Sequence, residues 1–495
     1  MTSDTDPRDR PASSDAADLP RPPAVPVSAA PAGRGLYCNR TLNLRALKAV
    51  GYDMDYTLVH YHVEAWEQKA YDYLQQKLAE RGWPVTDLRF QPDFAMRGLI
   101  VDTELGHLVK ADRFGYVKRA YHGLRRLDFD EQRRAYARTL VDLSDPRWVF
   151  LNTFFSLSEA CMYAQLVERV ESREVPEVVG YGDLWTRIRH ALDSAHAAGR
   201  LKQEIQTEPE RYVVLDPDAA LALVDQKEAG KRVLLVTNSE WSYTKAILEY
   251  ALDPFLPAGL TWRELFDLTI VSARKPGFFT ERGPLFEVVN DEGLLRPCVA
   301  GPTGPGVYLG GHAGLIEDYL GVSGSEILYV GDHLYTDVKV SKDIQRWRTG
   351  LIVRELEDEI AAMERHRGEQ ARLEQLMAEK TALERDQARL RLALQRREKG
   401  YGPAVSGDDA SEAAMARLRG RTDRLDNEIA PLATLLGTLY HPRWGPLMYA
   451  GSDQSHLARQ VESYADVYTS RVSNFVFESP FAYLRPPRGR MAHDS

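Results

Sequence analysis

Short apolar runs, each ending at polar residues, constrain the fold of this chain more than any other feature. Their length and their Val, Ile and Leu content are typical of strands that are buried on both faces. The runs are Ala46–Tyr52, Arg232–Val236, Leu268–Val271 and Ile327–Val330, with Gly350–Val353 as a further candidate. Helical patterns such as Tyr243–Leu252 lie between them. This alternation predicts an α/β fold with a parallel sheet and helices on both faces.

Polar residues follow the runs at the points where the strands should end. They are Asp53-Met54-Asp55, Thr237-Asn238-Ser239, Arg274-Lys275 and Gly331-Asp332. In open α/β sheets, ligands bind at the carboxyl ends of the strands. We therefore expect these residues to meet in one site.

The composition limits the class of protein. The chain has 495 residues, of which 44% are hydrophobic and 27% charged, and this predicts a globular protein with two or three domains. Its net charge of −9 argues against sequence-independent binding to nucleic acid. The sequence shows neither a membrane-spanning apolar run nor a secretory signal, so we expect no membrane partner. Its three cysteines, without CxxC spacing, fit a reducing, cytoplasmic location.

The chain divides into several expected parts. Seven prolines among Ala, Ser and Asp predict a disordered tail over residues 1–35. The stretch between Asp53 and Thr237 is far longer than a crossover helix requires, so we expect an inserted cap over residues 63–211. The remaining expected parts are a catalytic core over 36–62 and 212–354, a helical hairpin over 355–436, and a C-terminal segment over 437–495 that packs on the core.

The hairpin is predicted from leucine spacing. Leucines recur at spacings of three, four and seven within Glu355–Glu398, and a second helical pattern runs from Met415 to Leu436. The segment Tyr401–Asp409 between them contains Gly and Pro and reads as a loop. The pair predicts an antiparallel helical hairpin. One interpretation is that the hairpin is a structural or oligomerisation element. The other is that it recognises a partner protein.

Two carboxylates at one strand end point to a metal. Asp53 and Asp55 would repel each other there, and a hard, oxygen-seeking Mg²⁺ would relieve the repulsion. Asp332, after another strand, would supply a further ligand, and Asp337 could hold a lysine or the metal's waters. The competing interpretations are capped turns and solvated acids.

The other two strand ends carry groups that suit a phosphoryl group. Thr237 and Asn238 can donate hydrogen bonds to phosphate oxygens, although such residues also cap helices, and Ser239 could cap the helix that follows. Lys275 can offset the negative charge of a phosphoryl group during transfer.

In this order the four motifs resemble the haloacid dehalogenase (HAD) superfamily of phosphohydrolases and, more narrowly, the cytosolic purine 5′-nucleotidase family. The resemblance covers residues 37–485. The matching segments are Gly51-Tyr52-Asp53-Met54-Asp55-Tyr56-Thr57-Leu58, Leu151-Asn152-Thr153-Phe154-Phe155, Thr237-Asn238-Ser239, Arg274-Lys275-Pro276, Tyr329-Val330-Gly331-Asp332-His333, Gln460–Tyr468 and Ser479-Pro480-Phe481. The resemblance implies a HAD-like Rossmannoid sheet with a large inserted cap.

The resemblance also implies catalytic roles. Asp53 would attack the phosphorus and form an aspartyl-phosphate, and Asp55 would protonate the leaving oxygen and then deprotonate water. Mg²⁺ would be held by the carboxylates of Asp53 and Asp332 and by the backbone carbonyl of Asp55, with Asp337 supporting this shell. The residues implied to bind the phosphoryl oxygens are Thr237, Asn238 and Lys275.

Substrate recognition is assigned by the resemblance to the cap. Arg189, Asp193 and His196 are spaced to share one helix face, which would otherwise read as a charged, solvated face. Arg189 and Asp193 would bond the base, Lys202 would reach the phosphate side, and Phe155 would stack on the ring. The full set of matching positions is Asn152, Phe155, Arg189, Asp193, His196 and Lys202.

The function implied is that of a Mg²⁺-dependent 5′-nucleotidase acting on purine nucleoside 5′-monophosphates. A site that recognises a 6-oxo purine contains polar groups that pair with that base. A pyrimidine or an adenine would leave these groups unpaired, at a cost in binding free energy of about 1–3 kcal/mol. We therefore expect IMP and GMP to be preferred. Transfer of the phosphoryl group to a nucleoside is also possible for the family. Ser156 replaces an expected side-chain amide, which would relax base selectivity. The family further implies a homo-oligomer, either dimer or tetramer.

Two alternatives remain open. One is a HAD phosphatase that acts on another phosphomonoester. The other is an assembly protein without catalytic function, organised by its helical hairpin.

Overall fold

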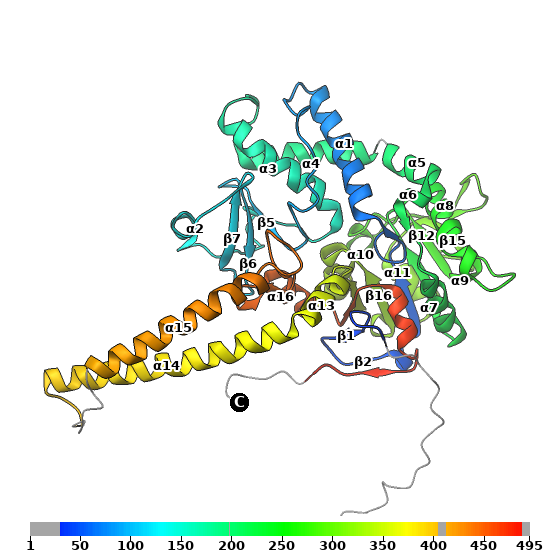
Figure 1. Ribbon diagram of the computed structural model, residues 1–495. Helices are drawn as coiled ribbons and strands as arrows, with labels where there is room; N and C mark the ends of the chain where they lie inside the picture. Colours follow the sequence, from blue (N-terminus) through cyan, green and yellow to red (C-terminus); the bar gives the residue numbers. More distant parts are fainter. Residues whose placement is uncertain (1–29, 198, 404–411, 488–495) are drawn as a thin grey trace, which may run out of the picture.

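The computed structural model describes residues 30–197, 199–403 and 412–487. Its centre is a ten-stranded sheet (Figure 1). The strand order of this sheet is β1-β20-β17-β16-β3-β11-β12-β15-β13-β14. Pairing is parallel from β20 through to β15. These strands are β20 (Val467–Thr469), β17 (Arg348–Ile352), β16 (Ile327–Gly331), β3 (Ala49–Tyr52), β11 (Arg232–Val236), β12 (Leu268–Val271) and β15 (Gly306–Gly310). The antiparallel edge strands are β1 (Tyr37–Cys38), β13 (Leu285–Val288) and β14 (Leu295–Pro297). All five expected strands are present, although the first starts later because residues Leu44–Ala46 form a 3₁₀ turn.

Helices cover both faces of this sheet, because successive strand residues point to opposite sides. On β11, Val233 and Leu235 join one apolar core, and Leu234 and Val236 join another. The first core includes residues of α7 (Pro217–Glu228) and α8 (Trp241–Ala251). The second includes residues of α10 (Gly277–Thr280), α11 (Ala313–Leu320) and α12 (Val340–Gln345). The expected α/β fold class, with a parallel sheet between helices, is confirmed.

The long insertion leaves and re-enters the core at one place. There β4 (His60–Tyr61) pairs antiparallel with β10 (Val213–Val214), so the two ends of the insertion lie side by side. Between them, α1 (Val63–Glu80) packs on α3 (Leu157–Glu171) and α4 (Tyr181–Ala197) (Figure 1). Trp66, Tyr71, Leu74 and Leu78 are buried on α1 at helical spacing, which accounts for this packing.

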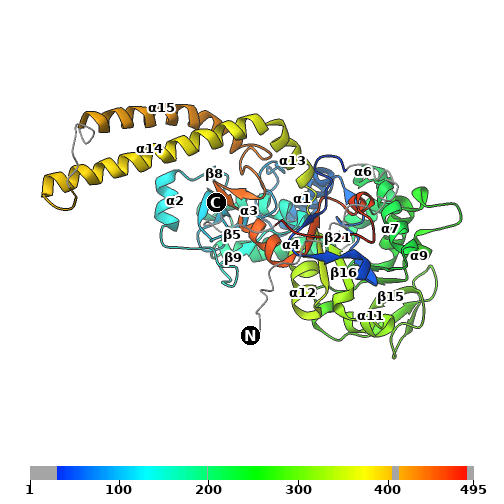
Figure 2. The ribbon, with the colours of Figure 1, turned by 90° about the horizontal axis from the view of Figure 1, so that it is seen from below.

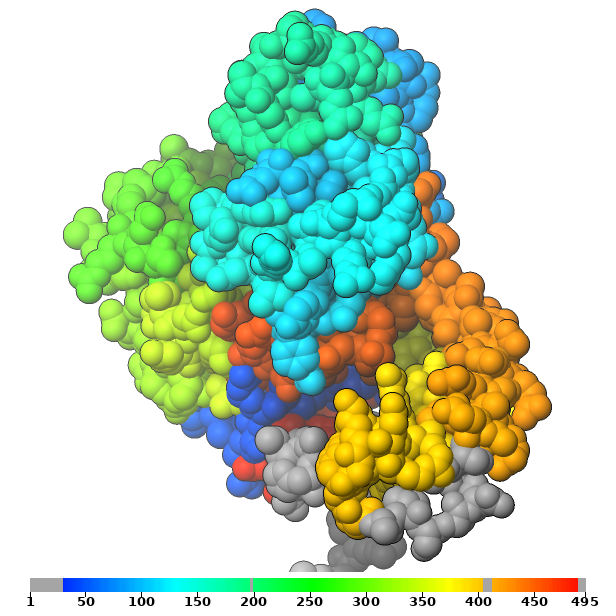
Figure 3. Space-filling view, turned by 90° about the vertical axis from the view of Figure 1, so that its left-hand side faces the viewer, coloured from blue at the N-terminus to red at the C-terminus, as the bar shows by residue number. Residues whose placement is uncertain are grey.

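An antiparallel sheet completes the insertion, in the order β8-β7-β6-β5-β9. Its strands are β5 (Ile100–Asp102), β6 (His107–Ala111), β7 (Val117–His122), β8 (Arg125–Arg126) and β9 (Trp148–Phe150), and the accompanying helices are α2 (Phe129–Tyr136), α5 (Arg200–Thr207) and α6 (Pro209–Tyr212). Figure 3 shows the cyan and blue-green surface of this insertion above the red C-terminal segment.

A helical hairpin projects from the body of the molecule (Figures 1 and 2). It consists of α14 (Arg367–Lys399) and α15 (Glu412–Leu436), which bury Leu376, Leu383, Leu425 and Ile429 between them. The expected single helix from Glu355 is interrupted, because α13 (Leu356–Arg365) ends at Arg365 and α14 begins at Arg367. The loop expected at 401–409 lies largely outside the described residues, as 404–411 are not described.

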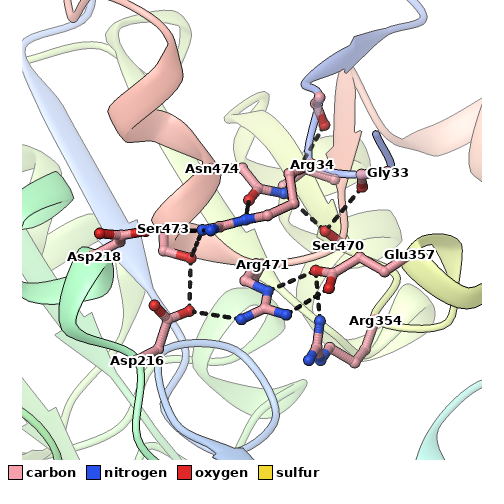
Figure 4. A network of polar contacts seen from close by, with 12 residues as sticks. Gly33, Arg34, Asp216, Asp218, Arg354, Glu357, Ser470, Arg471, Ser473 and Asn474 are labelled. Carbon is pink, nitrogen blue, oxygen red and sulfur yellow. Dashed lines mark hydrogen bonds and ion pairs between the residues drawn. The ribbon is translucent and has the colours of Figure 1, made fainter. Parts of the chain in front are cut away.

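A polar network joins the segments around Arg34 and Arg471 to the core (Figure 4). Arg471 binds Glu357 through Nε and Nη2, at 2.6 and 2.5 Å. Arg34 donates to Asn474 and Ser473, both at 2.8 Å. The prediction of a disordered tail up to residue 35 is therefore wrong at its end, where Arg34 is held in place. Residues 1–29 of that predicted tail lie outside the described residues.

The remaining elements are β2 (Leu42–Asn43), α9 (Trp262–Leu265), β18 (Tyr449–Ala450), β19 (Asp453–Gln454), α16 (His456–Tyr464) and β21 (Tyr483–Leu484). Among the described residues, no helix combines the length and the apolar character that crossing a membrane requires.

Candidate active site

Four neighbouring strands, in the order β16-β3-β11-β12, carry the predicted residues to one edge of the sheet. Asp53 directly follows β3 in the middle of this group, and its backbone N–H donates to the carbonyl of Val330 on β16 at 2.9 Å. A cavity of about 560 Å³ opens at this edge. The residues predicted to act in catalysis, to bind or support the metal or to bind phosphate all line it, namely Asp53, Asp55, Thr237, Asn238, Lys275, Asp332 and Asp337.

Lys275 is buried at the centre of the charged groups. Its Nζ lies 2.8 Å from Oδ1 of Asp53 and 2.7 Å from Oδ1 of Asp337, and it donates to the hydroxyl of Tyr329 at 3.0 Å. Burial alone would lower the pKa of Lys275, but Asp337 and Asp53 raise it well above its usual value. Tyr329 was not predicted, because a tyrosine inside a buried strand has no distinguishing signal in the sequence.

Asp53, Asp332 and Asp337 form an acidic cluster in which one carboxylate oxygen of each lies within 4.8 Å of the others. Burial raises the pKa of Asp53 to about 7 despite the opposing effect of Lys275. Burial, followed by repulsion from Asp337 and Asp53, raises the pKa of Asp332 well above its ordinary value. A divalent cation would remove this repulsion, and an all-oxygen donor set suits Mg²⁺. The residues present therefore fit the expected metal.

Gly331 allows Asp337 to reach this cluster. A Cβ at Gly331 would lie 2.4 Å from Cβ of Asp337, a distance that real side chains do not adopt. Asp337 also accepts a hydrogen bond from the backbone N–H of His333 at 3.1 Å. Asp337 thus lies beside Asp53 and Asp332 and holds Lys275, and its support of the metal shell stays a prediction.

Asp55 points to a different set of partners. Its Oδ1 accepts from the hydroxyl of Tyr61 at 2.5 Å, and its Oδ2 accepts from the hydroxyl of Ser239 at 2.6 Å. Ser239 was expected to cap the following helix, but α8 starts at Trp241 with Glu240 as its N-cap residue. Tyr61 comes from β4 and gave no signal in the sequence. The two hydroxyls hold the Asp55 carboxylate in a fixed orientation beside Asp53.

Asn238 fixes the position of the lysine loop. Its Oδ1 accepts from the backbone N–H of Lys275 at 2.6 Å, and its Nδ2 donates to the carbonyl of Lys275 at 3.2 Å. Thr237 accepts from the backbone N–H of Ser239 at 3.1 Å. The Asn238 side chain therefore acts on Lys275 in this structure, and its contact with a phosphate stays a prediction.

The insertion forms the opposite wall of the cavity. Of the predicted substrate-binding residues, the structure brings Phe155, Arg189, Asp193 and Lys202 to this wall. The Phe155 ring lies edge-on to the rings of Tyr56 and Trp66, with centroids 4.9 and 5.5 Å apart. Lys202 donates to Ser239 at 2.9 Å and pairs with Glu240 at 3.0 Å, so it reaches the strand-end side of the cavity.

The other predicted substrate residues lie elsewhere. Asn152 lines an adjoining cavity of about 330 Å³, which shares Arg189 with the first. His196 belongs to α4, but its side chain is outside the described residues.

Glu159 was missed by the sequence analysis. It lines both cavities on the buried side of α3. Burial raises the pKa of Glu159 to about 7, and the charge of Arg189 opposes this rise. A single glutamate in a helix gives no sequence signal, so only the structure shows that Glu159 is buried beside the cavity.

Comparison with known proteins supports one family. The model of the 5′ nucleotidase family matches residues 36–495. The human 5′-nucleotidase domain-containing protein 2 is 30% identical over 345 residues, which cover 66% of this chain and 64% of that protein. A 5′-nucleotidase domain-containing protein of Dictyostelium discoideum is 26% identical over 479 residues, covering 93% of this chain and 74% of that protein. The chain thus spans somewhat less than two thirds of the human relative.

Among solved structures, an archaeal β-phosphoglucomutase from a hyperthermophilic Pyrococcus covers 62% of this chain and 86% of its own, with 13% identity and a TM-score of 0.29. A likeness at this level carries no information about activity.

Proposed function

The chain belongs to the 5′ nucleotidase family, and from this premise we propose that it is a Mg²⁺-dependent 5′-nucleotidase that hydrolyses purine nucleoside 5′-monophosphates, with IMP and GMP preferred. One observation carries the proposal. Asp53 lies in the cavity as a member of the acidic cluster and is paired with a buried lysine, and a second carboxylate, Asp55, follows it two residues later.

Hydrolysis would take place in two steps. An oxygen of Asp53 attacks the phosphorus, the bond from phosphorus to the sugar oxygen breaks, and Asp55 delivers a proton to that oxygen. Asp55 then removes a proton from water, which attacks the phosphorus, releases phosphate and restores Asp53. Both oxygens of Asp55 accept hydrogen bonds, which orient its carboxyl group for these proton transfers.

Charge neutralisation is supplied from two sides. Lys275 would stay paired with the Asp53 carboxylate and approach the phosphoryl oxygens together with Thr237 and Asn238. We propose that Asp53, Asp332 and the backbone carbonyl of Asp55 hold Mg²⁺, with Asp337 next to it. When bound, the metal supplies positive charge that stabilises the transferring phosphoryl group.

Base recognition is proposed for the wall formed by the insertion. Phe155 would stack on the purine, Arg189 and Asp193 would bond its polar edge, and Lys202 would face the phosphate. The remaining proposed contacts are Asn152 and His196. A nucleoside hydroxyl that enters in place of water would give phosphotransfer instead of hydrolysis.

The proposal extends to organisation and location. We propose a catalytic core over 36–62 and 212–354, a specificity cap over 63–211, and a hairpin over 355–436 that contributes to a homo-oligomer. The C-terminal segment over 437–495 would complete the core. The proposed location is the cytoplasm.

The test is a phosphate-release screen over all nucleoside 5′-monophosphates and a panel of sugar phosphates, with and without Mg²⁺. We expect Mg²⁺-dependent release that is fastest for IMP and GMP, and no release by Asp53→Asn at unchanged melting temperature. Preference for a sugar phosphate would favour a phosphatase of another substrate class. Absence of release from every compound would favour the assembly protein.

A further inference from the structure

Arg97 is a buried cation outside the set of catalytic groups described above. It lies in the loop before β5, and its side chain is 2% exposed. Its Nε is 3.0 Å from Oε1 of Glu355, and its Nη2 is 2.6 Å from Oε2 of the same residue. Its remaining nitrogen, Nη1, donates to the backbone carbonyls of Asp332 and Ile352, both at 3.2 Å. One guanidinium thus joins the insertion, the loop of the acidic cluster and the residue before α13.

These contacts hold Asp332 from its backbone side. The carboxylate of Asp332 accepts a hydrogen bond from the hydroxyl of Thr153 at 3.3 Å. Arg97 holds the carbonyl of the same residue, and its guanidinium lies over the ring of Phe154 at 5.1 Å. The two contacts to Asp332 therefore come from segments of the insertion, although Asp332 itself follows a strand of the core.

The guanidinium of Arg97 is itself held in place. Glu355 fixes the guanidinium through two parallel bonds, the geometry in which an arginine is held most firmly.

The ion pair by itself does not explain a buried arginine here. Replacing a buried ion pair by apolar residues of similar volume is often neutral or stabilising. Apolar side chains at both positions would hold the fold but would leave the carbonyl of Asp332 without its donor. The third nitrogen of Arg97 is thus the feature that an apolar pair cannot replace.

We propose that Arg97 is a positioning residue that holds Asp332 in the orientation required to bind the divalent cation, with Glu355 fixing the guanidinium. This inference rests on the proposed Mg²⁺ site. Groups that orient metal ligands without touching the metal typically change affinity about 10–100-fold when they are removed.

The experiment measures the Mg²⁺ dissociation constant of the metal-free protein by isothermal titration calorimetry, together with the melting temperature without metal. We compare Arg97→Met with the double variant Arg97→Met/Glu355→Met. The single variant leaves a buried charge unpaired and should melt earlier, whereas the double variant should regain most of the stability. Both should bind Mg²⁺ about 10–100-fold more weakly than the wild type.

The chain offers a matched control. Arg147 binds Asp102 through two bonds of 2.9 and 2.7 Å within the five-stranded sheet, and Asp102 is buried. Arg147→Met should melt earlier to a similar degree as Arg97→Met and keep the wild-type Mg²⁺ affinity.

Each outcome decides the proposal. Wild-type Mg²⁺ affinity in the stable double variant would overturn it, and so would equal weakening in Arg147→Met. Should the methionine variants fail to fold, Arg97→Lys keeps the charge opposite Glu355, but a single ammonium cannot reproduce the two parallel bonds to Glu355 together with the separate bond to the Asp332 carbonyl. It should still bind Mg²⁺ about 10-fold more weakly, and an unchanged constant would overturn the proposal. Failure of the proposed Mg²⁺ site is distinguishable, because then the wild type itself would not bind Mg²⁺.

Discussion

Lys275 Nζ lies 2.8 Å from Oδ1 of Asp53, and both side chains are largely withdrawn from solvent. The same nitrogen contacts Asp337, so a single buried cation is shared by two members of the acidic cluster. This relationship makes the lysine part of the charge balance of the site even before a phosphate enters.

The first prediction concerns that lysine. Lys275→Met removes the charge that offsets the transferring phosphoryl group, so kcat should fall by about 10²–10³-fold. The variant also leaves buried carboxylates without their cation and should melt earlier, with partial recovery on adding Mg²⁺. Steady-state kinetics and thermal melts with and without Mg²⁺ check this. A variant with unchanged kcat would show that Lys275 serves stability alone.

The second prediction concerns removal of the metal. Mg²⁺ binding should relieve the repulsion among Asp53, Asp332 and Asp337, so the protein should melt later in its presence. At a concentration 100 times the dissociation constant, the gain in unfolding free energy is about 2.7 kcal/mol. Melting curves measured across Mg²⁺ concentrations and after chelation test it. Asp332→Asn serves as the comparison, since its response to Mg²⁺ should be much weaker.

The third prediction concerns the orientation of Asp55. Tyr61→Phe removes one of its two hydroxyl donors, a bond to a charged group worth about 1.5–3 kcal/mol. We expect kcat to fall about 10–100-fold with little change in KM. Tyr243→Phe is the matched control, because Tyr243 contacts the hydroxyl of Tyr61 at 3.1 Å. A similar loss in both variants would indicate general damage to the aromatic cluster.

The fourth prediction concerns base recognition. Arg189→Ala should raise KM for IMP by about tenfold or more, because it would remove the proposed hydrogen bond between a charged group and the base. KM for a generic aryl phosphate, which has no purine, should change little. Kinetics with both substrates make the comparison within one variant. Equal increases would mean that Arg189 does not read the base.

The fifth prediction concerns stability in acid. Burial alone would raise the pKa of Glu357, but its bonds to Arg471, Ser470 and Arg354 lower it from 4.5 to about 2. A carboxyl whose pKa is lowered by folding stabilises the protein above its unfolded pKa and loses this contribution as the pH falls through the folded value. The contribution, about 3 kcal/mol above pH 5, should disappear between about pH 4.5 and pH 2.

Glu357→Gln should therefore unfold more easily at pH 7 and show a shallower loss of stability on acidification. Chemical denaturation at several pH values measures both effects. Glu287→Gln, which breaks the exposed pair with Arg296, provides the control and should change stability by less than about 1 kcal/mol. Identical acid profiles for wild type and Glu357→Gln would contradict the prediction.

The strand ends were predictable because the signal is local. A buried strand shows as a short apolar run, and parallel strands present their carboxyl ends at one edge, so Asp53, Lys275 and Asp332 could be expected to meet. The hairpin was likewise predictable from leucine spacing, although the break between α13 and α14 was not.

The sequence alone determined which strands end in the polar residues that line the cavity, since apolar runs and their polar ends are properties of adjacent residues. Only the tertiary structure decided that Tyr61 and Ser239 hold Asp55, that Tyr329 contacts Lys275, and that Arg97 reaches Asp332. The physical reason is that a buried polar group must find a partner wherever packing brings one close. That partner can come from any distance along the chain, so neither spacing nor periodicity records it.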